Sequence, residues 1–243
     1  MNEYTIVLTS CGRFDLLKET LYSLFNSLDK PPARTIVIED TGNPEVENVV
    51  ANMKYPIEVL LNNPQIGQMK AIDKAYSLVH TPYIFHCEDD WKFLRSGFIA
   101  ESIAVLEACS DASMVCLRPR HELNPLIRDV PEIEISGIRC FAQDPSRHPE
   151  YFSHSFNPGL RRLCDYKNIG PYAPKGREED ISYLFKKAGF RIYNLAVPAV
   201  KHIGNDRHVD DPTQPKRART FFPKLRRSIL KRVKRIRRKF EAL

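Results

Sequence analysis

The segment YIFHCEDDW, from Tyr83 to Trp91, joins an apolar run to three adjacent acidic residues. The β-branched and aromatic residues at its start predict a buried strand. Three carboxylates at the end of such a strand repel one another and destabilise the fold if they remain unpaired. A divalent cation would relieve that repulsion, because Mg²⁺ and Mn²⁺ prefer carboxylate oxygens and share their ligand shell with substrate phosphates. A solvated acidic turn is the alternative interpretation.

Strands alternate with helices on the amino-terminal side of this segment. The patterns predict strands over residues 5–10, 34–39 and 57–61 and helices over residues 15–28, 45–53 and 68–79. This alternation is typical of an α/β fold with right-handed crossovers and a mainly parallel sheet. In such a sheet the carboxyl ends of the strands line the ligand crevice. We therefore expect the polar residues that end three strands to face one site: Thr9, Ser10, Glu39, Asp40 and the triplet Glu88, Asp89 and Asp90.

A second acidic group, Glu178, Glu179 and Asp180, begins a helical pattern on the carboxyl side. Acidic residues in a first turn stabilise the positive end of the helix dipole, so a well-capped helix explains them on structural grounds alone. The helix is followed by a strand over residues 192–197 and then by His202. Because neutral imidazole is a competent metal ligand, His202 is a candidate ligand, and His208 is a weaker one.

Overall composition indicates an ordinary globular protein. The chain has 243 residues, 42% of them hydrophobic, which is enough for one substantial α/β domain or two small ones. Six scattered cysteines without a CxxC pair argue against a zinc site and a disulfide scaffold. No segment approaches about 18 uninterrupted apolar residues, and no signal-like segment precedes the first strand, so we expect a cytoplasmic protein.

Positive charge is concentrated at the carboxyl end. Residues 212–243 hold thirteen Lys and Arg and one acidic residue, a net charge of +12, whereas the rest of the chain carries −5. Apolar residues recur there at spacings of three and four, which predicts a basic amphipathic helix. Such a helix favours an anionic membrane surface, bound through residues 216–243. Nucleic acid is the rival partner and is not expected, because the apolar stripe is regular and no nucleic-acid module is recognisable.

Several of these motifs together resemble glycosyltransferase family 2. They are TIVLTS at residues 5–10, IEDTG at residues 38–42, the loop before Gly67, and the acidic triplet after a tyrosine-containing strand. The resemblance covers about residues 4–205. It implies a GT-A fold over residues 1–211, with a Rossmann-like sheet flanked by helices, followed by the basic tail of residues 212–243. It also implies inverting transfer of a sugar from a nucleotide sugar to an acceptor hydroxyl.

The resemblance assigns a metal site to the acidic triplet, in the place of the family's DXD motif. Glu88, Asp90 and His202 are the implied ligands of Mn²⁺ or Mg²⁺. The triplet begins with Glu where the family usually has Asp, which leaves open whether Glu88 reaches the metal. The residues implied to contact the donor are Thr9, Ser10, Glu39, Asp40, Lys70 and Asp89, with Lys70 in place of the family's usual Arg-Asn pair.

The same resemblance places a catalytic base in the second acidic group. Inverting transfer needs a carboxylate that accepts the proton of the acceptor hydroxyl. We predict Asp180 as this base, with Glu179 beside it, although ungapped alignment through residues 187–189 selects Glu178 instead. The implied acceptor is a glycan or a lipid-linked molecule, as in cell-surface polysaccharide or glycan synthesis, and the enzyme would be peripheral at the inner face of a membrane.

Two other functions fit parts of the sequence. A sugar nucleotidyltransferase has a related fold, but residues 10–13 lack the glycine-rich signature that handles a nucleoside triphosphate. A non-catalytic sugar- or membrane-binding protein would use the same fold with structural acidic residues. Fold analogy alone does not separate these functions, nor does it identify the donor or acceptor.

Overall fold

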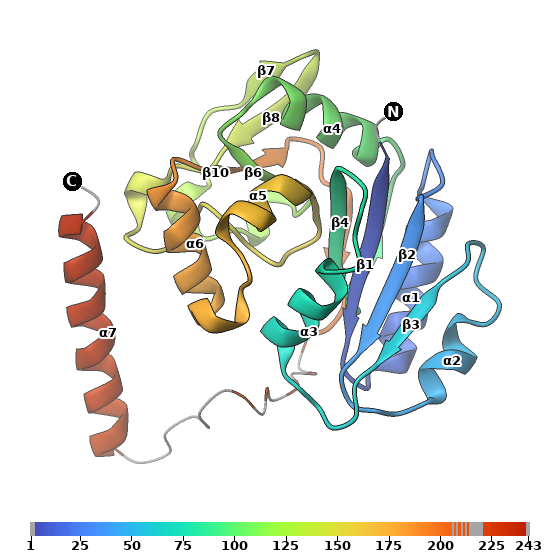
Figure 1. The fold of residues 1–243 in the computed structure, drawn as a ribbon. Helices are drawn as coiled ribbons and strands as arrows, with labels where there is room; N and C mark the ends of the chain where they lie inside the picture. The colour runs from blue at the N-terminus through green and yellow to red at the C-terminus, as the bar shows by residue number, and fades with distance from the viewer. Residues whose placement is uncertain are drawn as a thin grey trace.

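The computed structural model describes residues 3–205, 207, 209, 211, 213 and 221–241, and in the last segment the side chains of residues 225–239 and 241. A nine-stranded sheet runs through it in the order β3-β2-β1-β4-β9-β6-β10-β8-β7 (Figure 1). A two-stranded sheet pairs β5 with β11. The boundary expected between residues 211 and 212 falls where the described residues are interrupted, and His208 also lies outside them.

The first half of the large sheet is parallel, and helices connect its strands. Its elements are β1 (Tyr4–Ser10), α1 (Phe14–Asn26), β2 (Arg34–Glu39), α2 (Glu45–Val50), β3 (Glu58–Leu61), α3 (Gln68–Tyr76) and β4 (Tyr83–Glu88). β1 lies between β2 and β4 and pairs with both in parallel. These strands therefore end at one edge of the sheet, the lower edge in Figure 1.

The second half of the sheet is mixed. Its elements are β5 (Trp91–Phe93), α4 (Phe98–Ala108), β6 (Ala112–Cys116), β7 (Ile133–Ile135), β8 (Ile138–Ala142), β9 (Gly159–Arg162), α5 (Leu163–Ile169), α6 (Glu178–Lys187), β10 (Arg191–Leu195), β11 (Val200–His202) and α7 (Phe221–Glu241). β9 lies antiparallel between β4 and β6. Gly159 permits this close pairing, because a Cβ there would collide with the carbonyl of Val115.

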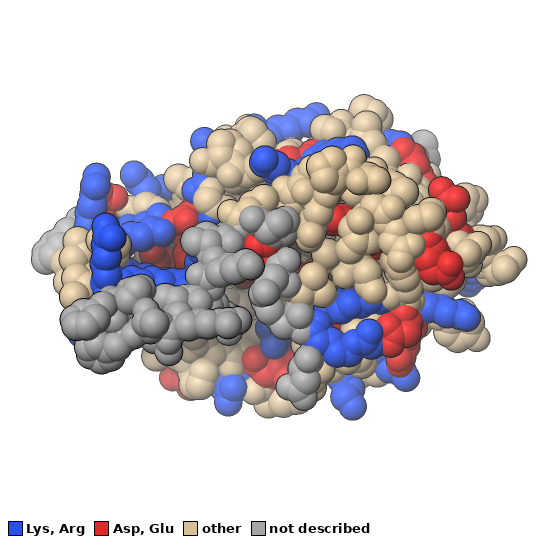
Figure 2. Space-filling model, turned by 90° about the horizontal axis from the view of Figure 1, so that it is seen from below, with Lys and Arg blue, Asp and Glu red and all other residues tan. Residues whose placement is uncertain are grey.

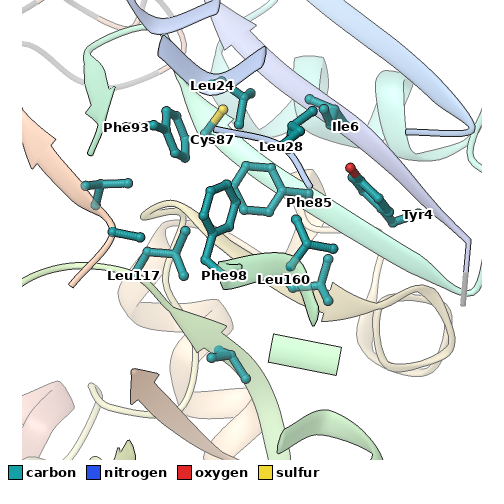
Figure 3. Close-up of a cluster of buried hydrophobic side chains, with 14 of the residues drawn as sticks. Tyr4, Ile6, Leu24, Leu28, Phe85, Cys87, Phe93, Phe98, Leu117 and Leu160 are labelled. Atoms are coloured by element: carbon teal, nitrogen blue, oxygen red, sulfur yellow. The ribbon is translucent and has the colours of Figure 1, made fainter. Parts of the chain in front are cut away.

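Two hydrophobic layers cover the sheet. Alternate residues of β1 point to opposite faces, so Ile6 and Leu8 join the layer under α1 and α4, whereas Val7 joins the layer under α3, α5 and α6. Figure 3 shows the first layer, in which Phe85 and Phe98 pack with ring centroids 5.6 Å apart. The layers hold the strand ends of β1, β2 and β4 in fixed positions below the core.

The expected fold class is confirmed, with differences at element ends. The strands of the first half lie within one residue of their predicted positions, whereas α2 ends at Val50 and α3 at Tyr76, both three residues early. Residues 119–175, which have no clear pattern, contain β7, β8, β9 and α5. Among the described residues, no helix is both long enough and apolar enough to cross a membrane.

Candidate active site

The acidic triplet lies at the carboxyl end of β4, as its sequence predicts. Glu88 is the last residue of β4, and Asp89 and Asp90 form the turn that leads into β5. The two aspartates are largely buried, with 1% and 7% of their surfaces exposed. Two buried carboxylates need compensating partners, so their contacts decide what this turn can do.

Arg13, at the start of α1, binds both aspartates. Its Nη1 donates to Oδ2 of Asp90 at 2.7 Å, and its Nη2 donates to Oδ1 of Asp89. The backbone N–H of Cys11 also donates to Asp89, at 3.3 Å. Burial raises the pKa of Asp89 to about 6 even though the Arg13 guanidinium lowers it. Arg13 is not among the site residues predicted from the sequence, and its position directly after the first strand is the only local signal for it.

His202 approaches Asp90 from the opposite part of the chain. The pairing of β11 with β5 places His202 beside Trp91, and the ring centroids lie 4.9 Å apart. The His202 Nε2 then lies 3.3 Å from Oδ2 of Asp90, and its Nδ1 lies 3.0 Å from Oδ1 of Asn205. When Nδ1 donates its proton to this amide oxygen, Nε2 carries a lone pair that can bind a metal, as in many metal-binding histidines.

The contacts of Asp90 test whether a divalent cation fits here. Its Oδ1 is buried and has no hydrogen-bond partner in the described structure, so one acceptor is left over beside an oriented imidazole. No group of three or more His, Cys, Asp or Glu converges on a metal position among the described residues. Mg²⁺ and Mn²⁺ are commonly bound by one or two protein ligands plus substrate phosphates. Asp90 and His202 therefore fit a cation shared with a diphosphate, and we expect no closed protein cage.

Glu88 points to different partners. Its Oε1 accepts a hydrogen bond from Nε2 of Gln68 at 2.9 Å, at the first turn of α3. Burial raises its pKa to about 8, and the negative charges of Asp90 and Glu178 add to this effect. Glu88 is thus bound to the first turn of α3, and its role as a metal ligand remains a prediction.

Glu178 is the first residue of α6 and belongs to the second acidic group. Its negative charge helps to raise the pKa of Glu88 in the triplet. Burial raises the pKa of Glu178 to about 7, whereas a hydrogen bond from Ser155 and the charges of Arg161 and Arg118 lower it. A carboxylate with a pKa near neutrality is suited to accept and release a proton at physiological pH.

Asp180 and Glu179 face a different environment from Glu178. The Asp180 Oδ2 accepts the backbone N–H of Arg177 at 3.1 Å and caps α6, while its Oδ1 accepts hydrogen bonds from Lys234 and Arg238 of α7. Hydrogen bonds from these cations lower the pKa of Asp180 although burial opposes them. Glu179, Asp180 and the predicted donor ligand Lys70 line a cavity of about 460 Å³ next to α7. The structure therefore does not place these three residues with the acidic triplet.

The acidic pair after β2 supports two loops. Glu39 is fully buried and accepts hydrogen bonds from the backbone of Gly12 and Thr41 at 3.1 and 3.0 Å. Asp40 accepts from the backbone N–H groups of Ile66 and Gly67 at 3.0 and 2.8 Å. Both carboxylates position backbone at the strand ends, and their predicted contact with a donor nucleotide remains untested.

Thr9 and Ser10 lie on β1 between these two groups. Ser10 pairs in register with Glu39, and Thr9 pairs with Glu88. The Ser10 hydroxyl is buried and has no hydrogen-bond partner in the described structure. The structure thus brings Thr9, Ser10, Glu39, Asp40 and the triplet to one edge, as the sequence predicts, and Arg13 joins them.

Several solved glycosyltransferase structures share the fold of this chain. A mannosyltransferase from Pyrobaculum calidifontis, in complex with GDP-Man and Mn²⁺, matches 84% of this chain with a TM-score of 0.61 and 12% identity. Staphylococcus aureus TarS 1–349 in complex with UDP-GlcNAc matches 85% with a TM-score of 0.60 and 14% identity. GalNAc-T7 with UDP, GalNAc and Mn²⁺ matches 93% with a TM-score of 0.61 and 11% identity.

These structures are longer than the present chain, which spans 58%, 62% and 47% of their respective lengths. Neither a protein-family model nor a curated protein sequence matches it. Identities of 11–14% relate folds and do not transfer a substrate. The sheet order, the helical layers and these matches show that the chain has the GT-A fold of nucleotide-sugar glycosyltransferases.

Proposed function

We propose that the protein is an inverting, metal-dependent glycosyltransferase that uses a nucleotide-sugar donor. The observation that carries this proposal is the Asp90–His202 pair, a carboxylate and an oriented imidazole 3.3 Å apart at the carboxyl edge of a GT-A sheet. Its support from comparison is that the three similar structures contain GDP-Man, UDP-GlcNAc, or UDP with GalNAc, two of them with Mn²⁺.

The donor site is proposed at the ends of β1, β2 and β4. Thr9, Ser10 and Asp89 line this edge, and Glu39 and Asp40 hold the loops beside it. Asp90 and His202 would hold Mn²⁺ or Mg²⁺ there, with Glu88 as a further candidate. The bound cation supplies electrostatic stabilisation of the charge that develops on the departing nucleoside diphosphate.

Glu178 is the proposed general base, in place of Asp180. Its carboxylate accepts the proton of an acceptor hydroxyl while that oxygen forms a bond to the anomeric carbon. The bond between the anomeric carbon and the diphosphate oxygen breaks on the opposite face, so the configuration inverts. Asp180 is less suited because two α7 cations hold it ionised and occupied, and Glu179 would act beside Glu178 by its charge.

The acceptor is proposed to be a glycan or a lipid-linked molecule of cell-surface polysaccharide or glycan synthesis. Residues 1–211 would form the catalytic domain. The tail, through residues 216–243, would bind the anionic inner face of a membrane. Support comes from α7, where Leu225, Ile229, Val233 and Ile236 expose 45–58% of their surfaces. Residues 216–220, which belong to the predicted membrane segment, lie outside the described residues.

Thermal shift with UDP, GDP, dTDP, CDP and ADP, each with and without Mn²⁺, tests the transferase proposal. Ligands that bind the native state raise Tm by mass action, so no acceptor is needed. One nucleotide should raise Tm only with Mn²⁺, and Asp90→Asn should abolish that shift. Asp129→Asn is a matched control, because Asp129 pairs with Arg147 at the surface.

One observation favours a second function, a non-catalytic binding protein. Arg13 already compensates Asp89 and Asp90, so the aspartates have a structural partner without a metal. If no nucleotide shifts Tm in folded protein with Mn²⁺ present, the transferase proposal is wrong and the binding function is favoured.

A further inference from the structure

The cavity beside α7 adjoins the candidate active site but is separate from its carboxylates. It has a volume of about 460 Å³ and lies between α7 and the first turns of α3 and α6. Gln68 of that α3 turn binds Glu88, and Glu178 precedes the lining residues Glu179 and Asp180. A ligand in the cavity would therefore contact the residues that follow the proposed base in α6.

α7 forms its wall of this cavity through cations. Lys234 and Arg238 bind Asp180, while Arg235 and Arg238 bind Glu150 at 3.0 and 2.8 Å. Glu150 is 4% exposed, so these contacts hold one helix face firmly against the core. Figure 2 shows the Lys and Arg side chains of α7 next to acidic side chains of the core.

This docking turns the apolar face of α7 outward. The residues that bind the core lie about half a helical turn, near 180°, from the stripe of Leu225, Ile229 and Val233, given about 100° per residue. A helix of a globular protein normally buries its apolar face and exposes its charges. The reversed orientation is explained if the outer face of α7 contacts the apolar part of a lipid bilayer.

The cavity also holds more positive charge than its acidic residues compensate. Lys70, Arg227 and Lys231 line it, and none of the three has a hydrogen bond or ion pair within the described part of the chain. Asp180, in contrast, is already shared between two cations. Five cations and the carboxylates of Glu150, Glu179 and Asp180 line the cavity, so its formal net charge is +2. This surplus favours an anion, and phosphate oxygens suit both guanidinium and ammonium groups.

A second hollow connects these cations with the apolar side of α7. Arg227, Lys231 and Lys234 line both hollows, and the second, of about 410 Å³, also contains Leu230. Leu230 is 59% exposed. A molecule with a phosphate on a hydrocarbon chain would therefore meet cations at one end and apolar side chains at the other.

We infer that this cavity binds the phosphate group of a lipid-linked acceptor. Lys70, Arg227 and Lys231 hold the phosphate, and the hydrocarbon passes Leu230 toward the bilayer at the outer face of α7. The inference rests on the proposed glycosyl transfer, since it supplies the acceptor of that reaction. It also changes the proposed role of Lys70, which would contact the acceptor phosphate and not the donor.

The test measures binding of farnesyl phosphate, below its micelle concentration, to the full chain by calorimetry. Farnesol and inorganic phosphate are measured in parallel. We compare Arg227→Ala/Lys231→Ala with the matched double variant Arg232→Ala/Lys239→Ala, which removes the same two charges from exposed positions outside both hollows. The first variant should weaken farnesyl phosphate binding by roughly tenfold or more, whereas the second should leave it within about twofold.

Each other result overturns the inference. If both double variants bind farnesyl phosphate equally weakly, general charge attraction explains the binding. If the wild type does not bind farnesyl phosphate, the cavity is not a binding site for it. If inorganic phosphate binds as tightly as farnesyl phosphate, the hydrocarbon chain contributes nothing to binding and the ligand is not a lipid. The nucleotide thermal shift on the same samples reports the donor site separately, so loss of that shift with farnesyl phosphate binding intact refutes the transferase proposal and leaves a phosphate-binding cavity.

Discussion

The His202 Nε2 lies 3.3 Å from Oδ2 of Asp90, although His202 ends β11, Asp90 lies in the turn after β4, and the two residues are more than one hundred positions apart. Two further residues fix this relationship. Trp91 packs against the imidazole, and Asn205 contacts its other nitrogen at 3.0 Å. Gly204 lies so close that a Cβ there would collide with the Asp90 carboxylate. The pair is therefore positioned before any ligand binds.

Asn205→Ala should weaken Mn²⁺ binding by roughly 10–100-fold, because partners that orient a ligating histidine contribute that much to metal affinity. The measurement is a Mn²⁺ titration followed by electron paramagnetic resonance, with saturating nucleotide. Asn48→Ala is the control, since the exposed Asn48 donates a hydrogen bond to the exposed Glu45. Unchanged Mn²⁺ affinity in Asn205→Ala would mean that His202 is not a metal ligand.

Glu178→Gln should lower the rate of sugar transfer by roughly 10²–10⁴-fold, since general bases contribute about that much. In the wild type, kcat/KM should fall as the pH drops through about 7, the pKa to which burial raises Glu178, because only the ionised carboxylate accepts a proton. Nucleoside diphosphate release with an identified acceptor gives both rates. Asp180→Asn is the comparison, and a larger loss there than in Glu178→Gln would restore Asp180 as the base.

Glu178→Gln should also stabilise the protein at alkaline pH. The pKa of Glu178 is about 7 in the folded state, above its ordinary value of 4.5, so the folded state binds more protons between these values. The contribution of Glu178 to stability is therefore fully present below pH 4.5 and is lost as pH rises through 7. Glu178→Gln should raise the free energy of unfolding by up to roughly 3 kcal/mol at pH 8 and by little at pH 4.5.

Urea unfolding at the two pH values measures that difference. Glu107→Gln, at an exposed position of α4, should show no comparable change between them. A stability gain at pH 4.5 equal to that at pH 8 would show that the effect does not come from ionisation of Glu178.

The sequence predicts the parallel half of the sheet well because its signals are local. Each strand there is an apolar run bounded by turn residues, and each polar cluster follows a strand end, which is how Asp90 and His202 can be selected. β9 is different, because Arg161 and Arg162 lie within a central strand. Arg161 is 2% exposed and donates to carbonyls of Ser155 and Asn157, whereas arginine is usually found at the solvated surface.

The parts of the site that sequence reasoning missed depend on contacts between distant segments. Arg13 meets Asp90 across 77 positions, and Asp180 meets Arg238 across 58. No spacing rule links such residues. These contacts distinguish Asp180 from Glu178. Cations of α7 bind Asp180, whereas burial raises the pKa of Glu178 to about 7.

Arg13→Ala should destabilise the protein strongly. It leaves the buried carboxylate of Asp89 without its cation, and breaking a buried pair by removing one partner costs about 3–5 kcal/mol. Arg34→Ala removes an exposed pair with Glu58 and should cost about 0–1 kcal/mol. Chemical unfolding measures both. Arg13→Ala/Asp89→Asn should recover part of the loss, and a double variant no more stable than the single one would show that Arg13 acts through other contacts.

Ile229→Asp/Val233→Asp should abolish binding of the full chain to vesicles that contain anionic phospholipid. Both residues expose more than half of their surfaces on the outer face of α7, so the substitutions leave the contacts of Lys234 and Arg238 with Asp180 unchanged. Burial of apolar side chains and attraction of basic ones both contribute to binding at a membrane surface. Arg226→Gln/Arg232→Gln should weaken binding in a salt-dependent manner and not abolish it, because the apolar stripe remains. Vesicle flotation distinguishes these outcomes, and full binding by Ile229→Asp/Val233→Asp would show that the outer face of α7 has a different partner.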